Sequence, residues 1–170
     1  MPWLQIQVED RRAVNIKDII RADKTDLNTG AWATGHVPRT AFPMSKVKDR
    51  KYKYGQEYRW RVVKFTCLGV KCRILILLNL AKQILRARLG VESGPDMIVL
   101  CDHEFHASEP GWHCHVTFEE AASVPPGAAR QDKMKWPKNI RVSERFTADE
   151  ASALSIVAAT FRFKEQGELI

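Results

Sequence analysis

Two dense apolar runs near the middle of the chain constrain its fold more than any other feature. Residues 60–67 and 70–78 are rich in valine, isoleucine, leucine and aromatic side chains, and only Leu68 and Gly69 separate them. Apolar runs of this length around a short turn are typical of two adjacent strands. Their apolar density indicates strands that are buried on both faces, so we predict that they form the centre of a sheet.

A helix is predicted over residues 147–160. Thr147 and Glu150 have the spacing of a capping box, in which two side chains satisfy backbone N–H groups at the start of a helix. A shorter segment at 14–20 also has apolar residues at helical spacing, and it forms either a helix or an irregular stretch. The apolar stripe of the long helix, which we expect to face the core, consists of Leu154, Val157, Ala158 and Phe161.

A third helix is predicted over residues 80–89. Asn79 is a favourable N-cap residue, and Gly90 stands where glycine commonly ends a helix. The apolar residues of this helix would face the core. Its basic residues would face solvent or a phosphate, and these are Lys82, Arg86 and Arg88.

The order of the elements predicts an α+β fold, with a mainly antiparallel sheet and one or two helices packed on one face. Short strands are also expected at residues 3–8 and 140–142. The chain has a length typical of a single domain, residues 1–170. Within it we expect a long loop at about 23–45 and a basic loop at about 119–139.

The charge of the chain favours an acidic partner. There are 27 lysine and arginine residues against 20 aspartate and glutamate residues, which gives a formal net charge of +7. Nucleic acid is the partner that such a balance favours first, and a protein partner is the alternative. The same charge can also serve solubility alone.

Cysteine usage and hydropathy indicate the compartment. The four cysteines form no Cys-x-x-Cys pair, and the charged residues near the N-terminus do not fit a secretory signal. Both features are typical of a cytoplasmic protein with reduced thiols. The longest apolar run, at 74–78, is too short to cross a bilayer, so we expect no membrane partner.

Basic and aromatic residues alternate between 46 and 61. Basic side chains can neutralise phosphates, while aromatic rings stack on unpaired bases, so this pattern favours nucleic-acid binding. An edge strand protected by lysines, with its aromatic rings packed on the sheet, explains the same pattern without a ligand. The candidate nucleic-acid-binding residues are Lys46, Lys48, Arg50, Lys51, Lys53, Arg59 and Arg61, and the aromatic residues are Tyr52, Tyr54, Tyr58 and Trp60.

The segment at 101–117 contains four of the five histidines of the chain. Imidazole and carboxylate groups are common ligands of divalent metal ions, and Mn, Mg or Zn is the expected cofactor. The same histidines could also be solvated surface residues without a ligand. The candidate metal ligands are His103, Glu104, His106, His113 and His115.

This segment reads as a hairpin, with a buried strand at 97–100, a turn at 107–111 and a returning strand at 112–118. The length of the loop decides which side chains share a face. With an even loop, Asp102, Glu104 and His106 face His113, His115 and Thr117, whereas with an odd loop Cys101, His103 and Phe105 do so. We favour the even loop, because Cys101 and Phe105 then lie on the buried side with Trp112 and Cys114.

His113-Cys114-His115 resembles the His-hydrophobic-His motif of the HUH endonuclease and relaxase group. His103-Glu104, upstream, is similar to the third-ligand motif of conjugative relaxases. The resemblance implies a metal ion that polarises a DNA phosphate and a tyrosine that attacks it. Since relaxase-type members carry this tyrosine upstream of the histidines, the resemblance nominates Tyr52, Tyr54 or Tyr58.

Two other families match less well. Residues 111–115 with Ser123 resemble the JAMM metalloprotease motif, but Pro126 occupies the position of its metal-binding aspartate. Residues 115–117 and 106–108 resemble the His-x-Thr motifs of 2H phosphoesterases, which that family places far apart rather than in one hairpin.

The sequence leaves three functions open. The first is a metal-dependent protein that acts on nucleic-acid phosphodiesters, with a tyrosine and Glu104 as candidate catalytic residues. The second is a non-catalytic basic module that binds nucleic acid or protein, as an inhibitor or accessory factor of a mobile element or defence system does. The third is a JAMM-like metallopeptidase. Whether the chain is an enzyme is not decided by its residues.

Overall fold

The structure, a computed structural model, describes residues 16–43, 51–52, 54–94, 96–106, 109–116, 129–130 and 147–164. At 51–52, 93, 96, 98, 109–116 and 129–130 it describes the backbone alone. The strands predicted at 3–8 and 140–142, and most of the basic loop at 119–139, lie outside these residues.

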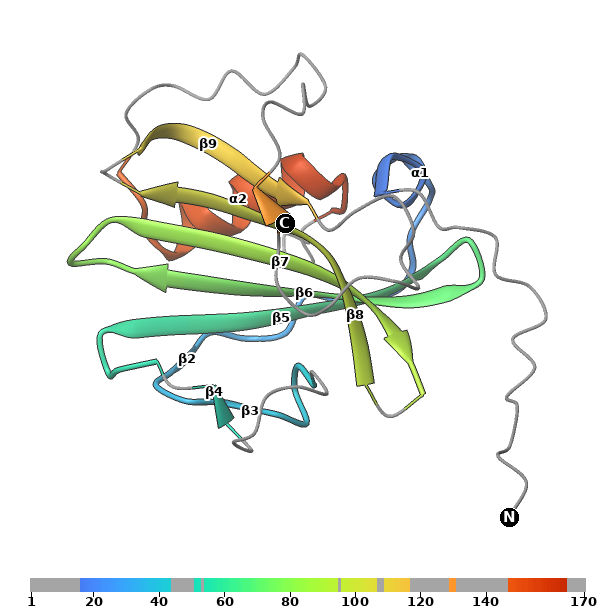
Figure 1. Ribbon diagram of the computed structural model, residues 1–170, viewed down its shortest axis with the longest axis horizontal. Helices are drawn as coiled ribbons and strands as arrows, with labels where there is room; N and C mark the ends of the chain where they lie inside the picture. Colours follow the sequence, from blue (N-terminus) through green and yellow to red (C-terminus); the bar gives the residue numbers. More distant parts are fainter. Residues whose placement is uncertain are drawn as a thin grey trace, which may run out of the picture.

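A long antiparallel sheet organises the molecule (Figure 1). Within the described residues its order is β1-β5-β6-β7-β8-β9-β10, and β2 pairs with β5 as well. Two further strands, β3 and β4, pair with each other as a separate ribbon. The strands are β1 (Thr25–Asn28), β2 (Ala33–Thr34), β3 (Val37–Pro38), β4 (Lys51–Tyr52), β5 (Tyr58–Cys67), β6 (Val70–Asn79), β7 (Ile84–Ser93), β8 (Asp96–His106), β9 (Glu109–Val116) and β10 (Ala129–Arg130).

The predicted central hairpin is confirmed. Strands β5 and β6 pair without a bulge from Tyr58 opposite Asn79 to Cys67 opposite Val70. The turn residues Leu68 and Gly69 have φ angles of 49° and 74°. Two successive residues with positive φ match the twist of the strands, which is why a two-residue turn can close this hairpin.

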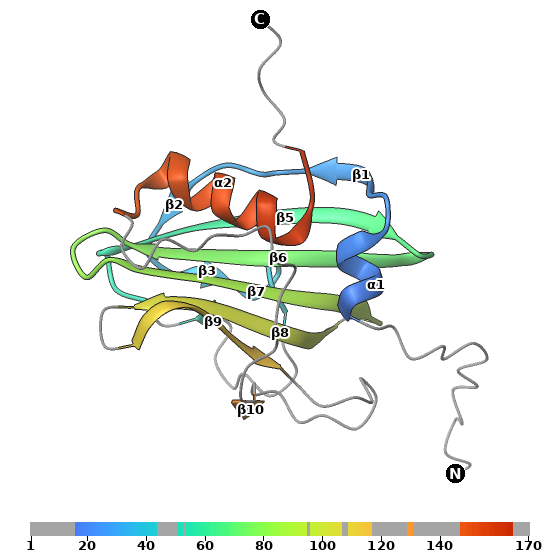
Figure 2. The same ribbon diagram turned by 90° about the horizontal axis from the view of Figure 1, so that it is seen from above.

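Both described helices pack on one face of the sheet, as Figure 2 shows, which confirms the predicted α+β class. These helices are α1 (Ile16–Arg21) and α2 (Glu150–Phe161). Neither has the length and apolar character that a membrane-crossing helix requires. The core between helices and sheet includes the whole predicted stripe of α2, Leu154, Val157, Ala158 and Phe161, together with Val63, Ile74, Ile76 and Leu85.

The start of α2 differs from the prediction by about two residues. Asp149, not Thr147, is the N-cap: its Oδ1 accepts a hydrogen bond from the Ser152 backbone N–H at 2.8 Å. Ser152 Oγ accepts one in return from the Asp149 N–H at 2.9 Å. The capping box is therefore formed by aspartate and serine, a pair that does the same work as the predicted Thr147 and Glu150.

The helix predicted at 80–89 is wrong. Residues 80–83 form a turn, in which Asn79 Oδ1 accepts a hydrogen bond from the Lys82 N–H at 2.9 Å, and β7 follows. In β7 every second residue, Leu85, Ala87 and Leu89, is fully buried under the helices. Side chains alternate between the two faces of a strand, so this period of two fits β7 as a strand rather than a helix. As a strand, β7 pairs along most of its length with both β6 and β8.

The second face of the sheet has a smaller apolar cluster. Residues 37–42, part of the predicted long loop, fold over it and bury Val37 and Phe42 completely. Arg73 holds this segment in place by donating hydrogen bonds to the carbonyl oxygens of Thr40 at 3.2 Å and Ala41 at 2.9 Å. The predicted loop at 23–45 therefore contains three short strands and a segment that packs on this face.

Candidate functional site

Two rows of polar residues cross the sheet on the face opposite the helices. In the first row Arg88 of β7 is the register partner of Asp102 of β8, and Asp102 is the partner of His115 of β9. In the second row Arg86 is opposite Glu104, and Glu104 is opposite His113. Register partners are nearest neighbours on a sheet face. We call these six residues the charged rows.

The favoured loop register is confirmed in its choice of face. Asp102 and Glu104 share a face with His115 and His113, whereas Cys101 is opposite Val116 on the other face. The pairs themselves are displaced by two residues from the predicted ones. Two features cause this displacement. The turn is shorter than predicted, since Glu109 lies opposite His106, which shifts that pair by four residues, and an irregularity between Glu104 and His106 reduces the shift to two at Glu104 and Asp102.

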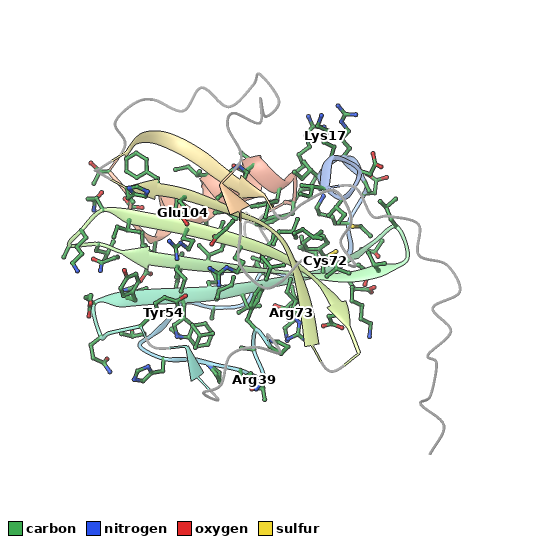
Figure 3. All side chains as sticks on the ribbon, in the orientation of Figure 1. Lys17, Arg39, Tyr54, Cys72, Arg73 and Glu104 are labelled. Atoms are coloured by element: carbon green, nitrogen blue, oxygen red, sulfur yellow. The ribbon has the colours of Figure 1, made fainter. Side chains whose placement is uncertain are left out.

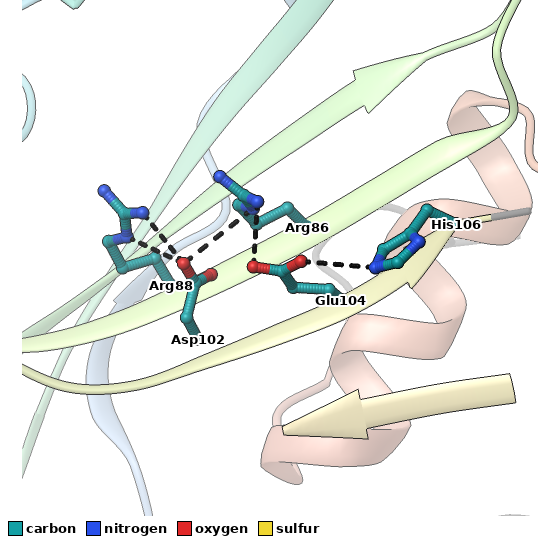
Figure 4. A network of polar contacts seen from close by, with 5 residues as sticks. All are labelled: Arg86, Arg88, Asp102, Glu104 and His106. Carbon is teal, nitrogen blue, oxygen red and sulfur yellow. Dashed lines mark hydrogen bonds and ion pairs between the residues drawn. The ribbon is translucent and has the colours of Figure 1, made fainter. Parts of the chain in front are cut away.

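Arginines hold one oxygen of each carboxylate, as Figure 4 shows. Arg88 Nη2 lies 2.8 Å from Asp102 Oδ2, and Arg88 Nε donates to the same oxygen at 3.3 Å. Arg86 Nη2 lies 2.8 Å from Glu104 Oε1, and its Nε lies 3.8 Å from Asp102 Oδ2. His106 Nε2 lies 3.7 Å from Glu104 Oε2. Both carboxylates are thus fixed in orientation.

Among the described residues, two buried atoms of the rows lack a hydrogen-bond partner, Asp102 Oδ1 and Arg86 Nε. The Asp102 side chain is only 4% exposed, yet its Oδ1 has no hydrogen-bond partner among the described residues. A buried carboxylate oxygen without a partner is costly, so such an atom indicates a donor or cation nearby. The position opposite Asp102 in β9 belongs to His115.

Tyr54 lies close to the arginine end of the charged rows. It packs beside the apolar cluster of this face, and burial raises the pKa of its hydroxyl above the usual value. The charges of Arg88 and Arg86 act on the same hydroxyl in the opposite direction. Figure 3 shows Tyr54 and Glu104 toward the same end of the sheet. The Tyr54 ring also contacts that of Tyr58, with centroids 5.3 Å apart.

The structure separates three of the predicted site residues from the charged rows. His103 is fully buried on the helix-covered face, where its ring meets the Phe161 ring edge-on at 5.6 Å. Arg59 lies on that face too and pairs with Glu150 of α2 at 2.6 Å. Arg61 extends along the sheet edge and donates to the Thr29 carbonyl at 2.6 Å.

The remaining predicted residues are only partly described. Within the side chains that the structure describes, no three of His, Cys, Asp and Glu could hold a metal ion together. The candidate ligands His113 and His115 are described by backbone alone, so they are not among those side chains. Lys51 and Tyr52 are likewise described by backbone alone, and Lys46, Lys48, Arg50 and Lys53 lie outside the described residues.

Sequence reasoning missed the arginines of the rows. The helix predicted at 80–89 places Arg86 and Arg88 toward solvent or a phosphate, whereas both are ion-paired on a sheet face. The signal that identifies them is the alternation Leu85-Arg86-Ala87-Arg88-Leu89, which is the pattern of a strand with one apolar face.

Comparison with protein-family models, curated proteins and solved structures gave no significant match. The function of the chain is therefore argued from its own side chains.

Proposed function

We propose that the charged rows form a metal-dependent site that acts on nucleic-acid phosphodiesters, as the resemblance to the HUH group implies. The observation that carries this proposal is the convergence of three kinds of group on one sheet face. A tyrosine, two arginines and two buried carboxylates lie together there, and the carboxylates are opposite two histidines. Each kind of group has a role in phosphoryl transfer.

The metal ligands would come from both strands of the β8–β9 hairpin. His113 and His115 would supply imidazoles, and Glu104 and Asp102 would supply carboxylate oxygens, among them Asp102 Oδ1. A carboxylate ligand held by a hydrogen bond through its other oxygen is a common arrangement around metal ions. Mixed imidazole and carboxylate donors suit Mn²⁺ or Zn²⁺ better than Mg²⁺, and the bound ion would polarise a phosphate oxygen.

Tyr54 is the best supported nucleophile of the three candidate tyrosines, because its hydroxyl lies within the influence of Arg86, Arg88 and Asp102. In the proposed step the Tyr54 oxygen attacks phosphorus, and the bond from phosphorus to the leaving oxygen breaks. The hydroxyl proton passes to a carboxylate of the rows, and the leaving oxygen takes up a proton. The arginines stabilise the negative charge that develops on the phosphate.

A cytoplasmic location and a nucleic-acid partner belong to the same proposal. Cys67, Cys72 and Cys101 are free thiols, as expected in a reducing compartment. The basic residues between 46 and 53 directly precede Tyr54 in the sequence. A nucleic-acid strand that they attract would therefore bind near the charged rows.

Two matched pairs of variants test the proposal. In metal analysis of the purified protein, we expect bound divalent metal to be lost in the His113→Ala/His115→Ala variant and retained in His36→Ala, which changes an exposed histidine. With single-stranded oligonucleotides and Mn²⁺, a covalent protein–DNA adduct on a denaturing gel should be lost in Tyr54→Phe and retained in Tyr58→Phe. Metal retained by the double variant, or an adduct in Tyr54→Phe, would contradict the assignment.

One observation favours the non-catalytic module as the second candidate. The charges of Arg86 and Arg88 are already balanced by Asp102 and Glu104, and burial raises the pKa of Tyr54, whereas an activated nucleophile needs a lowered pKa. Nucleic-acid binding that survives both a chelator and the double histidine variant, without any product, would select this candidate. The metallopeptidase stays a prediction, because its Ser123 lies outside the described residues.

A further inference from the structure

Two cysteines meet at the end of the central hairpin, on the face that the charged rows do not occupy. Cys67 is the last residue of β5 and Cys72 lies in β6, and their Sγ atoms are 3.9 Å apart. Both side chains belong to the core under α1 and α2, with residue exposures of 3% and 1%. The neighbouring turn residue Leu68 is 57% exposed, so the pair lies at the tip of the core rather than in its centre.

A lysine places a positive charge next to this pair. Lys24 Nζ donates to the carbonyl oxygens of Ile19, Ile20 and Ala22, each at 3.1 Å, and so is held at the end of α1. The hydrogen bond between the two thiols lowers the pKa of Cys67 to about 7; burial opposes this shift, and the charge of Lys24 supports it. The same hydrogen bond raises the pKa of Cys72. Cys67 is therefore the more acidic thiol of the pair, and Cys72 is the less acidic one.

We infer that Cys67 and Cys72 form a reversible dithiol–disulfide site, with Cys67 as the thiol that reacts first and a hydroperoxide as the oxidant. The Cys67 sulfur attacks one peroxide oxygen, the O–O bond breaks, and water leaves once the other oxygen is protonated. The product is a sulfenic acid on Cys67. Cys72 then attacks the Cys67 sulfur, the S–O bond breaks and a second water leaves. One hydrogen peroxide thus converts two thiols into one disulfide and two waters.

The strand register indicates why this disulfide would be reversible. Cys67 is opposite Val70 and Cys72 is opposite Phe65, so the two cysteines are diagonal rather than direct partners. Diagonal Cα atoms lie about 7–8 Å apart, at or beyond the usual limit for a disulfide. Closing the bond therefore requires a shift of the hairpin end, and strained disulfides of this kind are easily reduced.

Peroxide titration of the full chain tests the inference. The protein is treated with hydrogen peroxide, the remaining thiols are alkylated, and peptides are mapped by mass spectrometry with and without dithiothreitol. We expect a Cys67–Cys72 disulfide that dithiothreitol removes, and the same bond in a Cys101→Ser control, which changes a buried thiol of the same core. In Cys72→Ser, peroxide should instead carry Cys67 to the sulfinic acid, because the second thiol is missing.

A second measurement needs no substitution. Competitive alkylation of the native protein with limiting iodoacetamide should label Cys67 faster than Cys101, and the rate ratio should fall as pH rises above about 8.5, where ordinary thiols also ionise. Peroxide that leaves Cys67 and Cys72 as thiols, or a Cys67 that is labelled no faster than Cys101, would overturn the inference.

Discussion

Replacing Arg88 by methionine tests whether the charged rows are as desolvated as their geometry indicates. Methionine keeps much of the apolar volume of arginine but removes the only described donors to Asp102 Oδ2 at hydrogen-bond distance, which are Arg88 Nη2 and Nε. The Asp102 side chain is 4% exposed, so its charge would remain buried, and Arg86 Nε at 3.8 Å would be the remaining ion-pair partner among the described side chains. Breaking a buried ion pair from one side costs about 3–5 kcal/mol.

The assay is equilibrium urea unfolding followed by circular dichroism, with thermal melts alongside. For a chain of this size each kcal/mol corresponds to about 2–4 °C, so the melting temperature should fall by on the order of 6–20 °C. Arg59→Met is the matched control, because Arg59 and Glu150 are 44% and 37% exposed and such surface pairs contribute about 0.2–1 kcal/mol.

A double variant separates the lost interaction from the buried charge. In Arg88→Met/Asp102→Leu the charge is absent as well, so stability should return to within about 1 kcal/mol of the wild type or exceed it. An Arg88→Met variant that loses no more stability than Arg59→Met would refute the description of Asp102 as a desolvated carboxylate.

Three further predictions concern the sheet face that carries the charged rows, the core, and the N-cap of α2. Because burial raises the pKa of Tyr54, the unfolded chain ionises first and wild-type stability should fall as pH rises above about 10, a dependence that Tyr54→Phe should weaken in urea titrations. Leu78→Ala should cost about 2–5 kcal/mol, since Leu78 is fully buried, whereas Leu68→Ala at the exposed turn should change stability by less than about 0.5 kcal/mol. Hydrogen bonds from Ser152 lower the pKa of Asp149, so the stability that this cap contributes is present at neutral pH and is lost as pH falls through the lowered pKa. The Asp149→Ala variant should therefore have a lower melting temperature than the wild type at neutral pH, and this difference should vanish in strong acid.

The central hairpin could be predicted because its determinants are local. The apolar runs specify two buried strands, and Leu68-Gly69 leaves room for only a two-residue turn. Strand β7 could not be predicted with the same reasoning. Its Ile84, Leu85 and Leu89 fit helical spacing as well as they fit a strand, and the strand is formed because both neighbours, β6 and β8, offer long unpaired edges to it. A local sequence pattern does not show which distant segments will pair with a strand, so it cannot decide between helix and strand here.

The face shared by Asp102, Glu104 and the histidines was predictable for a related reason. Burying Cys101 and Phe105 fixes the orientation of β8, and the period of two then decides where the acidic residues lie. The arginines opposite them are misplaced by the helical interpretation of residues 80–89, although the alternation over residues 85–89 fits a strand. His103 breaks the pattern in the other direction, since a histidine on the apolar face cannot be distinguished by residue type from one on the polar face.

The balance of charges in the charged rows affects how a metal ion and a nucleic acid could bind there. Arg86 and Arg88 are balanced by Glu104 and Asp102, so the cluster offers neither a net positive site to a phosphate nor a net negative site to a cation. A divalent ion bound through the carboxylates of the rows would leave excess positive charge beside the arginines, and a phosphodiester would then offset it. Metal and nucleic acid should therefore bind cooperatively, with each raising the affinity of the other by the same factor, about 5–150-fold for a typical coupling. Oligonucleotide affinity measured by fluorescence anisotropy with and without Mn²⁺, at constant ionic strength, gives that factor directly. An affinity that is independent of the metal would leave the basic residues at 46–53 as the binding determinant and would favour the non-catalytic module.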